Sequence, residues 1–480
     1  MRDNRPILLV VGVMLTLVGL LMAIPAAIDL AVANPDWQVF LVAGFLTSFV
    51  GAALALANRG GRELSLQQAF VLTTALWVVL PAFAALPFAF CELEMSYTDS
   101  FFEAMSGLTT TGSTVISGLD VAPPGILMWR ALLQWLGGIG IIVTAVAVLP
   151  MLRIGGMQLF RMESSEREKA LPRAAQISLV IAVIYLALST LCALAYRLAG
   201  MPLFEAVAHA MTTIATGGFS TYDASIGFFD SPLIDAIATV FMIVGSLPFL
   251  LYFRAVRGEP LSLFADTQVR WFFGILATVI ATMSVWLVVT DAMAPGAALR
   301  YASFNVVSIV TGTGYATIDY GLWGAFPVTL FFFVMLIGGC AGSTSCGIKV
   351  FRFQILYATG MTQMRRLLQP HGVFVPMFNR HPVPESVADS VMSFFFLFVL
   401  SYALLALALT FVGLDLITAL SGAASALANV GPGLGEIIGP AGNFAALPDP
   451  AKWLLSAGML LGRLELFTVL VMFTPGFWRA

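Results

Sequence analysis

Apolar runs about 20 residues long recur from one end of this 480-residue chain to the other. About 20 apolar residues in a helix cross the roughly 30 Å hydrocarbon core of a bilayer. Charged residues make up only 10% of the sequence, whereas a soluble globular protein carries about 25%. The sequence therefore predicts an all-α polytopic membrane protein, and it excludes a cytosolic enzyme, a disordered chain and a secreted disulfide scaffold.

The apolar runs predict ten spanning segments, at residues 7–30, 38–58, 66–89, 127–150, 175–198, 233–253, 272–291, 325–348, 390–412 and 453–475. The first is longer than the apolar core of a signal peptide, about 7–15 residues, so we interpret it as a retained helix. Shorter, half-apolar segments at 98–110, 203–216, 299–312 and 416–429 each end in a glycine-containing turn. Because they are too short to cross, we expect re-entrant half-helices or interfacial helices.

Lys and Arg predict the orientation, because they concentrate in cytoplasmic loops. With both termini in the cytoplasm, all but five of the 23 basic residues fall on that side. Four of the five fall outside, namely Arg130, Arg197, Arg300 and Lys452, and Arg463 lies within the last span. Acidic residues instead dominate the predicted outer loops. An acidic mouth would concentrate cations, although outer loops also lack positive charge for topological reasons alone.

The four half-helices end in related sequences: LTTTGST (108–114), IATGGFS (214–220), VTGTGYA (310–316) and LANVGPG (427–433). One register aligns Gly112, Gly218, Gly314 and Gly431, and six residues earlier it aligns the hydroxyl residues Ser106, Thr212, Ser308 and Ser425. This pattern predicts an N-terminal helix pair (1–65) and four span, half-helix, glycine loop, span repeats, at 66–165, 166–258, 259–370 and 371–480. The alternative is four ordinary extracellular glycine turns.

A repeated glycine loop suits the binding of an alkali cation. Four loops around one axis can replace the hydration shell of the ion with backbone carbonyls. Glycine allows the unusual backbone angles and close approach that such loops need. Half-helices also direct the negative ends of their dipoles at the ion. The pattern therefore favours a cation pathway that is surrounded by the four loops.

The chain resembles the potassium-translocating membrane subunits of bacterial Trk systems, the TrkH and TrkG type of the Trk/Ktr/HKT superfamily. Beyond the glycine loops, the resemblance rests on RALLQWLGGIGI (130–141), LPMLRIGGMQLFRMES (149–164), GGCAGSTSCGIKVFR (338–352) and GRLELFTVLVMFTPGFW (462–478). It implies a channel-like pore of pseudo-fourfold symmetry, potassium uptake across the bacterial inner membrane, a homodimer, and gating by a cytosolic nucleotide-binding ring of the TrkA type. It implies neither a bound cofactor nor a nucleic-acid partner.

The resemblance also implies which residues form a selectivity filter: Thr110, Thr111, Gly112, Thr216, Gly217, Gly218, Gly312, Thr313, Gly314, Asn429, Val430 and Gly431. In plant relatives a serine at the position of Gly112 accompanies sodium preference, so glycine favours potassium. The four loops differ in sequence, so the site need not be symmetric. Rubidium and sodium are therefore further candidate ions.

A stretch of ten small residues, 338–347, interrupts the eighth predicted span. Glycine costs a helix about 1 kcal/mol relative to alanine, which disfavours a rigid helix here. A close helix crossing is one alternative, and a nucleotide loop is another, although Ile348 stands where a Walker motif requires lysine. The resemblance implies an intramembrane gate containing Gly338, Gly339, Gly342, Ser343, Thr344 and Gly347, together with Arg463.

Arg463 lies about ten residues into the last predicted span. A permanent charge at this depth must face a wet cavity or a partner. The resemblance implies an electrostatic barrier beneath the filter, and the alternative is a structural bridge between helices.

Six further residues and the four cysteines have specific expectations. We expect Asp99 and Glu205 to cap half-helices, with shaping of the pore mouth as the alternative, and His209 to make local hydrogen bonds. Arg352 and the pair Arg365 and Arg366 lie in a long cytoplasmic loop, 349–389, where they suit topology or contact with a regulatory ring. The cysteines, Cys91, Cys192, Cys340 and Cys346, are expected to be buried thiols.

Other classes of membrane protein fit less well. A membrane enzyme is disfavoured by three histidines and by the lack of HExxH and GxSxG motifs. A purely structural protein would need neither an acidic mouth nor Arg463. A sodium- or proton-coupled secondary transporter (a symporter) and a poorly selective alkali-cation pore stay open as alternatives.

Overall fold

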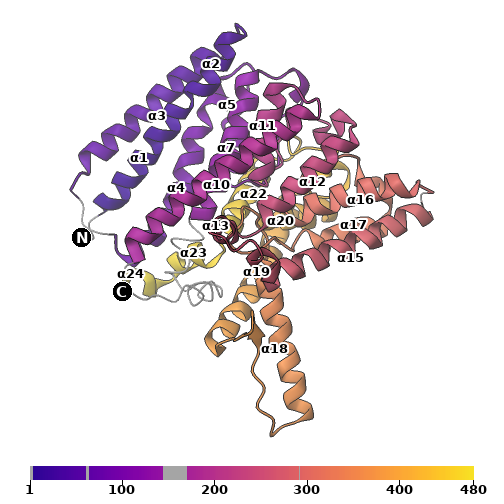
Figure 1. The fold of residues 1–480 in the computed structure, drawn as a ribbon. Coiled ribbons are helices and arrows are strands. Elements are labelled where there is room, and N and C mark those ends of the chain that lie inside the picture. Colours follow the sequence, from indigo (N-terminus) through magenta and orange to yellow (C-terminus); the bar gives the residue numbers. More distant parts are fainter. Residues whose placement is uncertain (1–3, 61–63, 144–169, 291, 480) are drawn as a thin grey trace.

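The computed structural model describes residues 4–60, 64–143, 170–290 and 292–479. The string 149–164 and the end of the fourth predicted span lie outside the described residues. Nearly all regular structure in the described part is helical, as Figure 1 shows. All four cysteines are buried, as expected.

The N-terminal segment forms two helical arms that pack closely, at one edge of the molecule in Figure 1. The arms consist of α1 (Arg5–Leu21) with α2 (Ala23–Ala31), and α3 (Trp37–Ala57). Glycines line their contact. A β-carbon on Gly12 would lie 2.6 Å from the Gly51 carbonyl oxygen, and one on Gly19 would lie 2.6 Å from that of Gly44. Small residues at these positions therefore let the two backbones touch.

Four helical units follow. The first contains α4 (Leu66–Ala84), α5 (Leu86–Phe90), α6 (Tyr97–Leu108), η1 (Leu119–Val121) and α7 (Pro124–Val143). The second contains α10 (Ala170–Leu198), α11 (Leu203–Ile214), η3 (Ser225–Phe229), α12 (Pro232–Ser246), α13 (Phe249–Val256) and α14 (Ser262–Ala265). The third contains α15 (Thr267–Thr290), α16 (Pro295–Val310), η4 (Tyr320–Trp323), α17 (Ala325–Val334), α18 (Val350–Leu368), β1 (Met377–Phe378) and β2 (His381–Pro382). The fourth contains α19 (Glu385–Phe411), α20 (Leu416–Ala428), α21 (Gly435–Ile438), α22 (Asp449–Arg463), α23 (Phe467–Leu470), η5 (Val471–Phe473) and α24 (Pro475–Arg479).

The four predicted half-helices are present as α6, α11, α16 and α20. Each has 12 to 16 residues, and within its unit each comes after a longer helix, namely α4, α10, α15 or α19. Their C-terminal halves are buried, which places the ends of these helices inside the protein.

Two of the ten predicted spans are bent, and the eighth is helical over only part of its length. Among the described residues, seven helices are long and apolar enough to cross a bilayer, and two bent pairs raise the number to nine. The predicted span 233–253 bends by 91° between α12 and α13, and 453–475 bends by 105° after α22. In the first, Leu247 is extended because it precedes Pro248. In the second, Glu465 and Leu466 have positive φ angles.

The predicted span 325–348 is helical only in α17, which is too short to cross. The small-residue stretch therefore interrupts it, as expected. The predicted cytoplasmic loop 349–389 contains α18 and the antiparallel pair β1 and β2, so its description as a loop is wrong. In Figure 1 this segment extends away from the rest of the helices.

Candidate functional site

The four half-helices end in the same turn. In each, a backbone N–H returns to the carbonyl of the aligned hydroxyl residue five positions earlier, which is the Schellman closure of a helix. The bonds are Thr111 N to Ser106 O (2.9 Å), Gly217 N to Thr212 O (2.9 Å), Thr313 N to Ser308 O (2.9 Å) and Val430 N to Ser425 O (3.0 Å). The residue before each donor has a positive φ: Thr110 (53°), Thr216 (50°), Gly312 (72°) and Asn429 (51°).

The aligned glycines then contact one another's loops in a closed cycle. Each has a positive φ, and each lies against the carbonyl oxygen of the residue before the glycine of the next loop. A β-carbon would lie 2.2 Å from Gly217 O if added to Gly112, 1.8 Å from Thr313 O if added to Gly218, 2.1 Å from Val430 O if added to Gly314, and 2.8 Å from Thr111 O if added to Gly431. The four loops therefore surround one axis in chain order. A side chain at any of these positions would push two loops apart.

A hollow lies on one side of this ring and is lined by residues from all four loops. Its lining includes the four aligned glycines, Arg130, Tyr222 and Asp223. The Asp223 carboxylate accepts hydrogen bonds from the N–H groups of Gly118 (2.8 Å) and Leu119 (3.1 Å). This acid therefore joins the second loop to the first.

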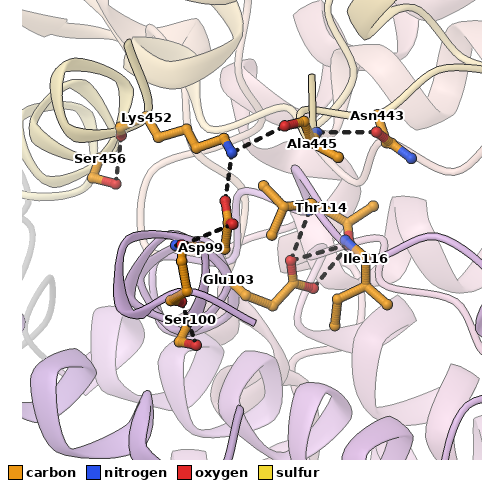
Figure 2. A network of polar contacts seen from close by, with 11 residues as sticks. Asp99, Ser100, Glu103, Thr114, Ile116, Asn443, Ala445, Lys452 and Ser456 are labelled. Carbon is orange, nitrogen blue, oxygen red and sulfur yellow. Dashed lines mark hydrogen bonds and ion pairs between the residues drawn. The ribbon is translucent and has the colours of Figure 1, made fainter. Parts of the chain in front are cut away.

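Glu103 of α6 is fully buried beside the first loop, and Figure 2 shows its carboxylate among donors. It accepts hydrogen bonds from the Thr114 hydroxyl (3.0 Å) and the Val115 N–H (3.0 Å), and it pairs with Arg130 Nε at 2.8 Å. Arg130 of α7 also donates to Ser220 O at 2.6 Å. This network links the first loop to the second.

Two other basic residues that the sequence predicts on the outer side form ion pairs as well. Lys452 contacts Asp99 and donates to Ala445 O (3.0 Å), as Figure 2 shows. Arg300 pairs with Asp235 at 2.7 Å and with Asp230 at 3.1 Å. These pairs neutralise part of the acidic excess expected at the mouth.

The capping prediction for Asp99 and Glu205 is wrong. Ser96 caps α6 by accepting from the Asp99 N–H, and α11 starts after Pro202 without a side-chain cap. Asp415, which received no such expectation, caps α20, and its hydrogen bonds from Thr418 hold its pKa below the ordinary value.

The prediction for His209 is confirmed. Its ring nitrogens lie 2.9 Å from Glu205 O and 2.9 Å from Ser220 Oγ. The imidazole thus connects α11 to the loop that follows it.

The chain between α17 and α18 forms an ordered loop that contacts the ends of two half-helices. We name residues 335–349 the inner loop. Its Thr344 hydroxyl donates to Ile214 O (3.0 Å) and Gly245 O (2.8 Å), and its Ser345 hydroxyl donates to Thr311 O (2.6 Å). The inner loop therefore engages carbonyls at the C-termini of α11 and α16.

The small residues predicted as a gate permit this conformation. Gly342 and Gly347 each have φ of 72°. A β-carbon on Gly338 would lie 1.7 Å from Cys346 O, and one on Gly339 would lie 3.0 Å from Ser246 O. The Ser343 hydroxyl donates to Cys340 O at 2.6 Å within the loop.

Arg463 ends α22 and joins this loop to the first repeat. Its guanidinium donates to Gly137 O of α7 (2.8 Å) and to Thr344 O (3.3 Å), and it contacts the Cys346 sulfur. Arg463 therefore forms a structural bridge from α22 to α7 and to the inner loop, which is the alternative role that the sequence suggested for it. Its role as an ion barrier stays a prediction.

The prediction that Arg352 lies in a loop is wrong. It is fully buried in the first turn of α18, where it forms an ion pair with Glu465 and lies 3.7 Å from the centre of the Phe394 ring. Arg365 and Arg366 are exposed in the last turn of the same helix. The sequence held one signal of this ion pair. Glu465 lies within a predicted span, and a buried carboxylate requires a cationic partner.

Comparisons with known proteins agree with this architecture. A family model named TrkH and described as "Cation transport protein" matches residues 36–479. The chain is 46% identical to the Trk system potassium uptake protein TrkI of Halomonas elongata, covering 100% of this chain and 98% of the relative. It is 40% identical to TrkH of Escherichia coli K12, covering 99% of both chains. The crystal structure of the potassium transporter TrkH from Vibrio parahaemolyticus superimposes with a TM-score of 0.93 at 39% identity, with 100% of both chains covered. The chain therefore belongs to the TrkH family of cation transport proteins, which are membrane transporters and not enzymes.

Proposed function

We propose that this protein takes up potassium across the bacterial inner membrane through a pore on the axis of the four glycine loops. The relatives named as potassium uptake proteins match it over nearly its whole length. The single observation that carries the proposal is the closed cycle of glycine-to-carbonyl contacts. It supports a ring of backbone oxygens such as a dehydrated alkali cation requires.

The proposed filter consists of the three residues that end at each aligned glycine. Backbone carbonyls of the twelve residues 110–112, 216–218, 312–314 and 429–431 are the candidate ligands. The C-termini of α6, α11, α16 and α20 add the negative ends of their dipoles below the ring. Non-helical backbone at this depth is stable because it lines a pathway or is buried in protein.

The inner loop is the proposed gate. Its Thr344 and Ser345 hydroxyls donate hydrogen bonds to carbonyls at the ends of α11 and α16. Arg463 donates a further hydrogen bond to the Thr344 carbonyl of the loop. Opening then requires these hydrogen bonds to break. The guanidinium of Arg463 also places a positive charge where it repels a cation that leaves the ring.

Two partners follow from the resemblance and stay predictions: a second copy of this chain and a cytosolic nucleotide-binding ring of the TrkA type. The exposed Arg365 and Arg366 at the end of α18 are candidate contacts for an acidic surface of that ring. Both termini are expected in the cytoplasm.

Rubidium uptake into proteoliposomes tests the proposal. We expect purified protein to take up rubidium, with strong competition by potassium and weak competition by sodium and lithium. Equal competition by sodium would contradict the potassium preference and favour a general alkali-cation pore. If uptake is absent even with the TrkA-type partner and nucleotide, the pore itself is refuted. Dependence of uptake on an imposed proton or sodium gradient would show coupled transport instead of conduction.

A further inference from the structure

The segments that follow the four glycine loops share a register that breaks at one position. Their aligned glycines are Gly137, Gly245 and Gly462, in α7, α12 and α22, and Gly338, in the inner loop just after α17. A β-carbon on any of the three helical glycines would lie within 3 Å of a half-helix carbonyl oxygen. Three residues before these glycines stand Gln134, Met242, Met335 and Met459, all fully buried. A buried polar amide in the first repeat therefore replaces a methionine.

Gln134 reaches from α7 to the loop of the second repeat. Its Nε2 donates to Gly217 O at 2.6 Å, and its Oε1 accepts from Phe219 N at 3.0 Å. Gly217 O is the carbonyl that lies against Gly112 in the ring. The amide thus binds one of the four ring carbonyls directly and also holds the backbone N–H two residues later.

The ring shows a matching break in symmetry. The residue before the aligned glycine is β-branched in three loops, as Thr111, Thr313 and Val430, and is Gly217 in the second. The backbone does not require glycine there, because the φ angle of Gly217 is not positive. Gln134 does require it, since a β-carbon on Gly217 would lie 2.4 Å from the Gln134 amide carbon.

We propose that Gln134 is a positioning residue that raises the preference for potassium over sodium by holding the Gly217 carbonyl in place. The inference deepens the proposed function and rests on it. A smaller cation requires ring oxygens to move inward, and an oxygen held by an amide resists that movement. The hydrogen bond also occupies one of the two lone pairs of this oxygen, which weakens its field at the ion. Both effects act against sodium more than against potassium.

The decisive variant is Gln134→Met, which installs the residue of the other three repeats. We expect it to fold, to transport rubidium, and to require about three- to tenfold less sodium for half-inhibition of rubidium uptake, as loss of one hydrogen bond implies. Potassium competition should change less. Gln38→Met, at an exposed glutamine of α3, is the matched control and should behave as wild type.

A second pair of variants tests the same contact without transport. Gly217→Thr alone forces a side chain into the Gln134 amide and should lower the melting temperature. The double variant Gln134→Met with Gly217→Thr rebuilds the arrangement of the other repeats and should recover most of that loss. It should keep the increased sodium competition, because the amide donor is still absent.

The outcomes separate the two proposals. If wild type itself does not prefer potassium, the filter is wrong and so is the role of Gln134. If wild type prefers potassium, and sodium inhibits rubidium uptake by Gln134→Met no more than uptake by wild type, only the role of Gln134 is wrong. An equal loss of uptake for all ions in folded Gln134→Met would show a merely structural glutamine and overturn the inference as well.

Discussion

The Ser345 hydroxyl of the inner loop donates a 2.6 Å hydrogen bond to the backbone carbonyl of Thr311, at the end of the third half-helix. The loop thus binds a carbonyl of the same helix terminus from which the third glycine loop leaves. With the pore that we propose on the axis of the glycine loops, a cation below the ring would compete with the inner loop for this oxygen.

Removing this hydroxyl should favour the open gate. We expect Ser345→Ala to raise rubidium leak without the partner by about fivefold, because the hydrogen bond to Thr311 contributes roughly 1 kcal/mol to the closed state, and the Gly339 N–H loses its acceptor as well. Thr190→Ala, which removes an exposed hydroxyl of α10, is the control. Leak equal to that of wild type would show that the bond does not hold the loop.

Arg463→Ala should raise basal cation flux further, because it removes both a positive charge below the ring and two hydrogen bonds to backbone carbonyls. Arg463→Lys keeps the charge and loses the forked donor geometry, so it separates the two contributions. Rubidium uptake and thermal stability, measured in parallel on both variants, would test this expectation. Unchanged or lower flux in folded Arg463→Ala would refute the barrier.

Substitution of an aligned glycine should damage the ring. Gly314 has φ of 83°, and a β-carbon would lie 2.1 Å from Val430 O, so Gly314→Ala must displace the fourth loop. We expect loss of potassium preference or of uptake. Gly274→Ala in α15 is the control, because a β-carbon there has no neighbour within 4 Å. Wild-type ion competition in Gly314→Ala would contradict the ring as the selective element.

The buried pair of Glu103 and Arg130 should be necessary for stability. Removing one partner of a buried ion pair leaves the other uncompensated and costs about 3–5 kcal/mol. We therefore expect Glu103→Gln and Arg130→Met each to lower the melting temperature strongly.

The double variant tests whether the two residues act through each other. It should cost less than the sum of the two single variants, as a double-mutant cycle in detergent would measure. Additive losses would show that the two side chains stabilise the protein independently.

Local sequence patterns predicted the half-helices and the interruption at 338–347, because each depends on a nearby glycine turn or on residues of low helix propensity. They did not predict the bend after α22. That bend places Glu465 and Leu466 at positive φ, a conformation that glycine adopts more readily. It accompanies the ion pair of Glu465 with Arg352, which is 113 residues away in the chain.

The candidate filter was predicted as a set of four loops, but the order of contact between the loops was not. That order depends on which carbonyl meets which glycine, and no periodicity in one loop contains this information. The same limitation hid Gln134, because its partner Gly217 belongs to the next repeat. Arg352 was misplaced since a charged residue at the end of a span resembles any cytoplasmic charge until its buried partner is known.

Arg352 anchors the inner end of α18 against the bend of the fourth repeat, while the far end of this helix, with Arg365 and Arg366, is exposed. A 19-residue helix is about 28 Å long, and its backbone hydrogen bonds make it stiff along its axis. This stiff helix connects its exposed tip directly to the inner loop that precedes it. A tilt imposed at its exposed tip would pull on the loop and on the Glu465 bend in a single movement.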